Sequence, residues 1–130
     1  MTSERPMTKK ILIIDDSEQD RKIIKRFLSG VGYDNIIMSE TGEDGLVQAR
    51  EQDPDIILLD TNLPGMDGFE TCRQIKTIKG LKAKVIIVTG LVDAVDASKA
   101  RRMGADDYCV KTSDYAQLLQ SVQKLLEPIN

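Results

Sequence analysis

Five short, largely apolar segments recur along the chain, and stretches with helical periodicity separate them. Three of the five contain four consecutive isoleucine, leucine or valine residues, at 11–14, 56–59 and 85–88. Uninterrupted runs of this kind are typical of strands that are covered on both faces. We therefore expect strands over residues 11–14, 35–39, 55–59, 84–88 and 107–110.

The intervening segments carry apolar residues three or four positions apart, which predicts five helices packed on a core. These stripes are Ile23, Ile24, Phe27 and Leu28; Leu46, Val47 and Ala49; Phe69, Cys72 and Ile75; Val92, Ala97, Ala100 and Met103; and Leu118, Leu119, Val122, Leu125 and Leu126. Gly30, Gly104 and Pro128 are expected to end helices, and Thr41 with Asp44 to begin one. Strand–helix alternation repeated five times predicts an α/β fold, a doubly wound three-layer sandwich with a parallel sheet.

The composition excludes several classes of protein. A chain of 130 residues corresponds to one domain, and a net charge of −3 gives no basic excess for nucleic acid. The absence of histidine removes histidine metal sites and histidine-activated nucleophiles. Cys72 and Cys109 lie far apart, so we expect free, buried thiols in a reducing compartment.

The N-terminal residues lack the apolar core of a secretory signal, and no apolar stretch reaches the length of a membrane span. We therefore expect a cytoplasmic protein without a membrane partner. Residues 1–8 are expected to form a disordered lead, followed by one domain over 9–127.

Polar residues follow four of the five predicted strands. They are Asp15 and Asp16, Asp60, Thr89 with Gly90, and Lys111. In a parallel sheet, all strands end at the same edge, and ligands bind in a crevice there. Each residue alone is best explained as a turn, cap or solvated side chain. Their combined order and placement instead predict a single polar site.

Three carboxylates in one crevice raise one another's pKa or require a counter-cation. Lys111 supplies a single positive charge, so a divalent ion is expected as well. Mg²⁺ fits because it binds one or two carboxylates and retains water and phosphate oxygens as ligands. An aspartate beside Mg²⁺ and a lysine can act as a nucleophile toward phosphorus.

Residues 11–16, 55–68, 85–90 and 104–111 together resemble the receiver domain of response regulators, of the chemotaxis-regulator type. The resemblance extends over about residues 8–127. Its most specific part is the loop after the third strand, where Pro64 and Gly68 stand at set distances from Asp60. This resemblance implies a flavodoxin-like sandwich with strand order 2-1-3-4-5.

The resemblance also implies a role for each site residue. Asp60 is the expected phosphoacceptor. Asp16, Asp60 and the backbone carbonyl of Asn62 are expected to bind Mg²⁺ directly, and Asp15 through metal-bound water. Thr89 and Lys111 would bind phosphoryl oxygens, with Gly90 leaving room for them, and Thr89 and Tyr108 would form a switch.

The same resemblance implies particular partners. The phosphoryl donor would be a sensor histidine kinase or a phosphotransfer protein. A downstream protein would bind the face built from the fourth helix, the fifth strand and the fifth helix, with no direct contact to nucleic acid. Because the chain would modify only itself, we do not expect an enzyme in the usual sense. The sequence leaves open whether the chain is a complete regulator or part of a longer protein.

One position departs from the family pattern. Thr112 follows Lys111, where the family usually has proline, often after a cis bond. A cis bond before a residue other than proline costs about 2.5–4 kcal/mol. We therefore expect a trans bond here, which would redirect the start of the last helix.

Three other functions compete with a phosphorylated receiver. A degenerate receiver would act as a constitutive docking module, although every site residue is present. A phosphohydrolase with an aspartyl nucleophile would carry an Asp-x-Asp motif starting at the position of Asp60, together with a cap insertion. This chain has Asn62 at the third position of that motif and no insertion. A flavin-binding protein would need a Ser-, Thr- and Gly-rich loop where Asp15 and Asp16 stand.

Overall fold

The computed structural model describes residues 9–90, 94–112 and 114–127. The expected disordered lead over residues 1–8 lies outside the described residues, as do Val92 and Pro128. Within the described ranges, no helix is long and apolar enough to cross a membrane.

Five parallel strands form one sheet in the order β2-β1-β3-β4-β5. They are β1 (Lys10–Ile14), β2 (Asn35–Ser39), β3 (Ile56–Asp60), β4 (Lys84–Thr89) and β5 (Asp107–Val110). This confirms the predicted fold and strand order, with strand bounds that differ from the predicted ones by at most one residue at either end.

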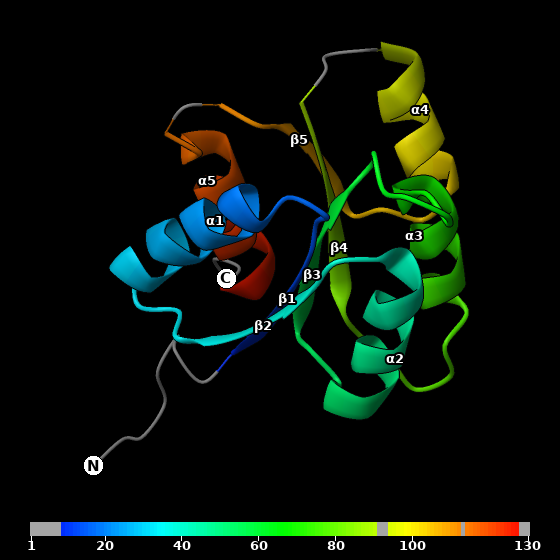
Figure 1. Cartoon of the computed structure of the whole chain (residues 1–130), viewed down its shortest axis with the longest axis horizontal. Coiled ribbons are helices and arrows are strands. Elements are labelled where there is room, and N and C mark those ends of the chain that lie inside the picture. The colour runs from blue at the N-terminus through cyan, green and yellow to red at the C-terminus, as the bar shows by residue number, and fades with distance from the viewer. Residues whose placement is uncertain (1–8, 91–93, 113, 128–130) are drawn as a thin grey trace.

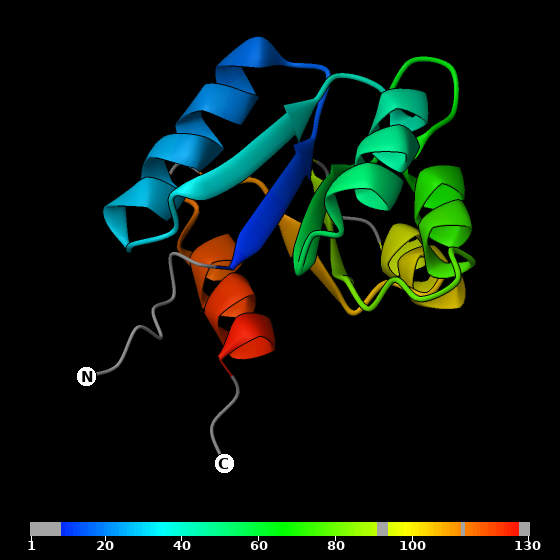
Figure 2. The same ribbon diagram turned by 90° about the horizontal axis from the view of Figure 1, so that it is seen from below.

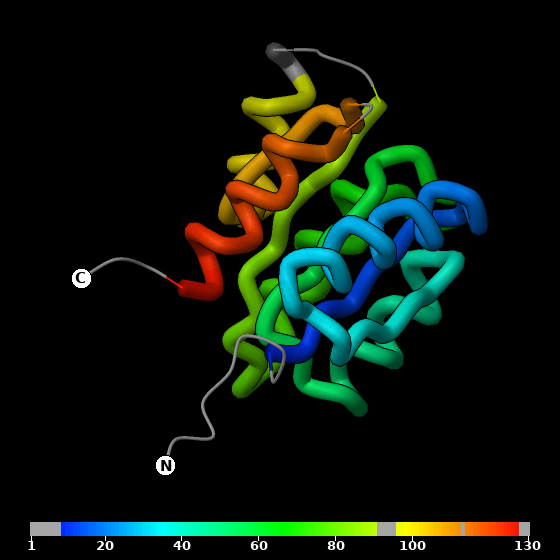
Figure 3. The backbone as a smooth tube through the Cα atoms, turned by 90° about the vertical axis from the view of Figure 1, so that its left-hand side faces the viewer, coloured from blue at the N-terminus to red at the C-terminus, as the bar shows by residue number. Residues whose placement is uncertain are grey.

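Five helices cover the two faces of the sheet. They are α1 (Glu18–Gly30), α2 (Gly42–Gln52), α3 (Gly68–Lys76), α4 (Ala94–Arg102) and α5 (Ala116–Leu126). Figure 1 shows α1 and α5 on one face and α2, α3 and α4 on the other, and Figure 2 shows the same layers from below. Figure 3 looks onto the face that α1 and α5 cover.

Each face of the sheet has its own apolar core. Ile11 and Ile13 pack with Leu28 of α1 and Val122 of α5 in the first core. The alternate residues of the same strand, Leu12 and Ile14, join the second core beneath α2, α3 and α4. Successive side chains of a strand point to opposite faces, so a central strand between two helical layers must be apolar at every position.

Side-chain caps determine where the first helices begin. Thr41 accepts a hydrogen bond from the backbone N–H of Asp44 at 3.0 Å, which confirms the predicted cap of α2. Ser17 caps α1 in the same way, by accepting from the backbone N–H of Asp20 at 3.1 Å. Such caps satisfy backbone donors that the first turn leaves unpaired. The Ser17 cap also holds the residues after β1 in a defined position next to the strand end.

The segment between β5 and α5 follows the predicted backbone isomer. No peptide bond in the described part of the chain is cis, so the Lys111–Thr112 bond is trans. Helix α5 then begins at Ala116, directly after Tyr115, which has a left-handed backbone with φ of 53°. The Asp114 carboxylate accepts the N–H of Ala116 at 3.1 Å. Asp114 therefore caps this helix in place of Tyr115.

Candidate functional site

Sheet register brings the acidic residues together. Ile14 of β1 pairs with Leu59 of β3, so Asp15 and Asp60 follow at neighbouring positions on adjacent strands. One carboxylate oxygen from each of Asp15, Asp16 and Asp60 lies within 4.8 Å of the others. Asp15 and Asp60 are only 2% and 7% exposed, whereas Asp16 is exposed. Two of the three carboxylates are therefore largely shielded from water.

A cavity of about 680 Å³ lies at this edge of the sheet. It brings together the predicted residues Asp15, Asp16, Asp60, Asn62, Thr89, Gly90 and Lys111, which come from four strand ends. The lining also includes Asp20, Asp67, Asp96 and Lys99, so it holds six aspartates and two lysines. The acidic excess favours a cation as its occupant.

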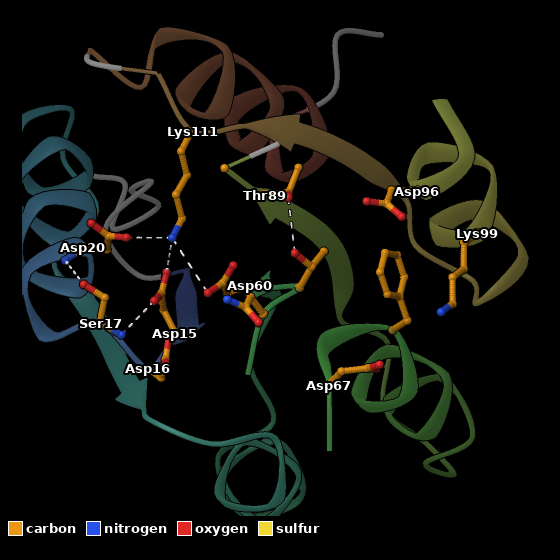
Figure 4. Close-up of a pocket in the computed structure, with 14 residues that line it drawn as sticks. Asp15, Asp16, Ser17, Asp20, Asp60, Asp67, Thr89, Asp96, Lys99 and Lys111 are labelled. Carbon is orange, nitrogen blue, oxygen red and sulfur yellow. Dashed lines mark hydrogen bonds and ion pairs between the residues drawn. The ribbon is translucent and has the colours of Figure 1, made fainter. Parts of the chain in front are cut away.

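Lys111 is the cation at the centre of the acidic group (Figure 4). Its Nζ lies 2.9 Å from Oδ2 of Asp15, 2.7 Å from Oδ2 of Asp20 and 3.8 Å from Oδ2 of Asp60. Although burial lowers the pKa of Lys111, its hydrogen bonds to Asp20 and Asp15 raise that pKa above its ordinary value. The ammonium therefore stays charged throughout the physiological range.

Asp60 is held in an environment that opposes its negative charge. Burial is the largest cause and, with the charge of Asp15, raises the pKa of Asp60 from 3.8 to about 6. The Lys111 charge and the backbone N–H of Asn62 act in the opposite direction without cancelling the effect. Lys111 alone therefore leaves the carboxylates incompletely neutralised.

The donor set of this group fits a hard divalent cation. The site offers carboxylate oxygens whose negative charge Lys111 does not fully neutralise, and these are conditions that suit Mg²⁺. Asp15, Asp16 and Asp60 can hold such an ion with carboxylate oxygens. Asn62 lines the same cavity, where its backbone carbonyl could serve as a further oxygen ligand.

On the other side of Asp60, two threonines meet. The Thr61 hydroxyl donates to the hydroxyl of Thr89 at 3.2 Å, and Thr89 is buried. Next to them, a β-carbon added to Gly90 would have no heavy atom within 4 Å. The space in front of Gly90, which lines the same cavity as Asp60, is therefore open.

Tyr108 does not line this cavity. It is half-buried on β5 and packs against the second core. It borders a separate hollow of about 340 Å³ with Ala97 and Ala100 of α4 and with Asp107. The structure thus places Tyr108 between the sheet and α4, on the surface predicted to contact a downstream protein.

Sequence reasoning missed two residues near the lysine. Asp20 forms the shortest ion pair to Lys111, and its signal in the sequence was its position in the first turn of a predicted helix, four residues after Asp16. Tyr115 is buried, and its ring lies 5.7 Å from that of Phe27. Burial raises the pKa of Tyr115, and the charge of Asp20 adds to this effect. No local sequence pattern around Tyr115 indicated that its side chain would be buried near the lysine.

The two cysteines match their prediction. Cys72 and Cys109 are both free and buried. Burial raises the pKa of each thiol to about 11, so neither has the thiolate character of a nucleophile.

Known proteins share this sequence pattern and this fold. A profile of the response regulator receiver domain matches residues 11–123. The transcriptional regulatory protein AfsQ1 of Streptomyces coelicolor is 41% identical over 101 residues, which cover 78% of this chain and 44% of that protein. The alkaline phosphatase synthesis transcriptional regulatory protein PhoP of Bacillus subtilis is 34% identical over 120 residues, covering 92% and 49%.

The chain therefore spans about half the length of the curated relatives it matches. Among solved structures, a CheY-like response regulator receiver domain protein from Methanospirillum hungatei superposes with a TM-score of 0.83 and 28% identity. That superposition covers 92% of this chain and 94% of the other.

Proposed function

Because this chain belongs to the response regulator receiver domain family, we propose that it accepts a phosphoryl group on Asp60 and thereby switches a protein-binding surface. The observation that carries this proposal is the position of Asp60, which is buried beside Asp15 and an ion-paired Lys111 in one acidic cavity. A nucleophile, a fixed cation and an oxygen-rich cation site are the parts that phosphoryl transfer to a carboxylate requires.

The proposed step is a transfer between two proteins. An ionised oxygen of Asp60 attacks the phosphorus of a phosphohistidine on a kinase or phosphotransfer protein. The bond from phosphorus to the donor nitrogen breaks, and an acyl phosphate forms on Asp60. Lys111 contributes positive charge next to the transferred group, and Thr89 contributes a hydroxyl that can donate to one of its oxygens.

Asp16, Asp60 and the backbone carbonyl of Asn62 would hold Mg²⁺ directly, and Asp15 would act through water. When bound, the ion would supply positive charge against the anionic phosphoryl group and the crowded carboxylates. Asp60 must be ionised to react. Because its pKa is raised, a nearby counter-cation would increase the ionised fraction of Asp60 at neutral pH.

The output of the switch would arise from the movement of Thr89. A new phosphoryl group adds charge and three acceptor oxygens, so Thr89 would turn toward it. Tyr108 would then move into the space behind Thr89 and change the face of α4, β5 and α5. A shift from mostly inactive to mostly active needs about 5.5 kcal/mol. Charge-assisted hydrogen bonds of about 1.5–3 kcal/mol each could supply much of that difference.

We further propose that the protein acts in the cytoplasm, with a sensor histidine kinase or phosphotransfer protein upstream and a protein target downstream. Several relatives are named as transcriptional or DNA-binding regulators. We do not assign DNA binding to the residues described here, because their cavity is acidic and the chain has a net charge of −3. The chain would modify itself and would not turn over a free substrate.

The direct test is intact-mass measurement after incubation with acetyl phosphate. We expect the wild-type chain to gain the mass of one phosphoryl group in Mg²⁺ and little in EDTA. Asp60→Asn should gain none, although it keeps the shape of the site. A wild-type chain that gains no mass, even in Mg²⁺, would instead support a constitutive docking module.

A further inference from the structure

Asp20 contacts Lys111 from helix α1, whereas the residues of the proposed phosphoryl site lie at the ends of strands. Its Oδ2 accepts a hydrogen bond from Lys111 Nζ at 2.7 Å, across 91 positions of sequence. Asp20 lies in the first turn of α1, whereas Lys111 follows β5. The contact therefore connects α1 to the segment that leads into α5.

The first turn of α1 holds the backbone of Asp20 in place. Ser17 accepts the backbone N–H of Asp20 at 3.1 Å, while the N–H of Ser17 donates to Oδ1 of Asp15 at 2.9 Å. The same turn therefore positions both of the carboxylates that contact Lys111. Asp20 is about 30% exposed at its side chain, so α1 rather than burial defines its location.

A lysine ammonium has three N–H donors and no acceptor. In this site, Asp20 and Asp15 lie within hydrogen-bond distance of Nζ, at 2.7 and 2.9 Å. Asp60 is too distant for a hydrogen bond, at 3.8 Å. Among the residues that the structure describes, these two contacts use two of the three donors, and the carboxylate next nearest to Nζ is that of Asp60.

We propose that Asp20 is a positioning residue, which anchors the Lys111 ammonium so that one N–H remains directed at a phosphoryl oxygen on Asp60. The inference rests on the proposed function and deepens it. If Mg²⁺ draws the Asp15 carboxylate toward itself, Asp20 remains as the fixed partner of Lys111. Holding a catalytic group in place before the reaction is a general means of strengthening its later contact.

An anchoring role and simple charge repulsion predict opposite effects of removing Asp20 on the binding of a phosphoryl group or its analogue. Asp20 is an anion near a site for an anionic group. If only its charge mattered, its removal would strengthen the binding of a phosphoryl group or its analogue. If Asp20 anchors Lys111, removal weakens that binding despite the lost repulsion. Asn at this position separates the two, because it loses the charge but keeps an oxygen that can accept from Lys111.

The experiment measures beryllofluoride affinity at saturating Mg²⁺ by calorimetry or NMR titration. We expect Asp20→Ala to weaken beryllofluoride binding about five- to twentyfold, and Asp20→Asn to stay within about threefold of wild type. The matched control is Glu18→Ala, which removes an exposed carboxylate from the same helical turn. Within the described part of the chain, Glu18 forms one ion pair, with solvent-exposed Lys22 at 3.1 Å, so this variant should bind as wild type does.

A double-mutant cycle then tests whether Asp20 acts through Lys111. In a Lys111→Met background, Asp20→Ala should cause no further loss of beryllofluoride affinity. Unchanged or tighter binding by Asp20→Ala would overturn the anchoring role, as would an equal further loss in the Lys111→Met background. A wild-type chain that binds Mg²⁺ but neither beryllofluoride nor a phosphoryl group would overturn the proposed function itself, and this inference with it.

Discussion

Gly68 packs directly against the backbone of Asp60: a β-carbon built on Gly68 would lie 2.1 Å from the Asp60 carbonyl oxygen. It would also lie 2.8 Å from the α-carbon of Thr61. The N–H of Gly68 donates to the carbonyl of Thr61 at 3.1 Å, which closes the loop onto the strand end. The start of α3 therefore contacts the main chain that carries the proposed phosphoacceptor.

Gly68→Ala should accordingly disturb both stability and the site. Backbone atoms cannot rotate away as a side chain can, so the loop has to shift. We expect a loss of about 1–3 kcal/mol in the free energy of unfolding, as for other overpacked sites, together with slower phosphorylation. Gly30→Ala is the control, since a β-carbon there meets nothing within 4 Å. Equal denaturation midpoints for the two variants would contradict this contact.

The raised pKa of Asp60 predicts how stability depends on pH without metal. The folded state has a pKa of about 6 and the unfolded state has the ordinary value of 3.8, so folding favours the protonated carboxyl. Ionised Asp60 therefore lowers stability above pH 6, and this loss is relieved as the pH falls from 6 toward 4.

In EDTA at pH 7, Asp60→Asn should be more stable than wild type by about 1–2 kcal/mol, because it removes this charge. The difference should shrink as the pH falls toward 4. Thermal denaturation across this pH range would measure it. A variant that is less stable than wild type at pH 7, with a pH-independent difference, would refute the assignment of the shift to Asp60.

The same carboxyl predicts that protons compete with Mg²⁺. A group with a pKa of about 6 is mostly ionised at pH 7 and mostly protonated at pH 5. Apparent Mg²⁺ affinity should then fall roughly tenfold over that interval, as expected for one competing proton. Calorimetric titration at both pH values measures the change. Constant affinity across this range would show that Asp60 is not a ligand.

Thr89 and Tyr108 offer a test of the proposed switch. The chain has three tyrosines and no tryptophan, so fluorine-labelled tyrosine gives a simple NMR spectrum. Beryllofluoride with Mg²⁺ should shift the Tyr108 resonance in the wild-type chain. Thr89→Ala should still bind Mg²⁺, but its Tyr108 resonance should shift far less, because the proposed link to the phosphoryl group is lost. A full shift of the Tyr108 resonance in Thr89→Ala would show that Tyr108 responds independently of Thr89.

Much of this molecule could be predicted from local patterns. Runs such as 56–59 indicated buried parallel strands, because only apolar residues are stable between two helical layers. Once the strands are parallel, their carboxyl ends must share an edge. The proximity of Asp15, Asp60, Thr89 and Lys111 therefore followed from their order along the chain alone.

Other features depended on how distant elements pack. The Lys111–Asp20 ion pair requires α1 and the β5–α5 segment to meet on one side of the sheet. The close contact of Gly68 with Asp60 and the burial of Tyr115 likewise arise from packing between separate segments. Periodicity determines which face of an element is apolar. The sequence by itself therefore determined the three layers of the fold and the edge of the sheet at which the site lies. It does not determine the angle and depth at which two elements pack, so only the tertiary structure decided which carboxylate holds the lysine.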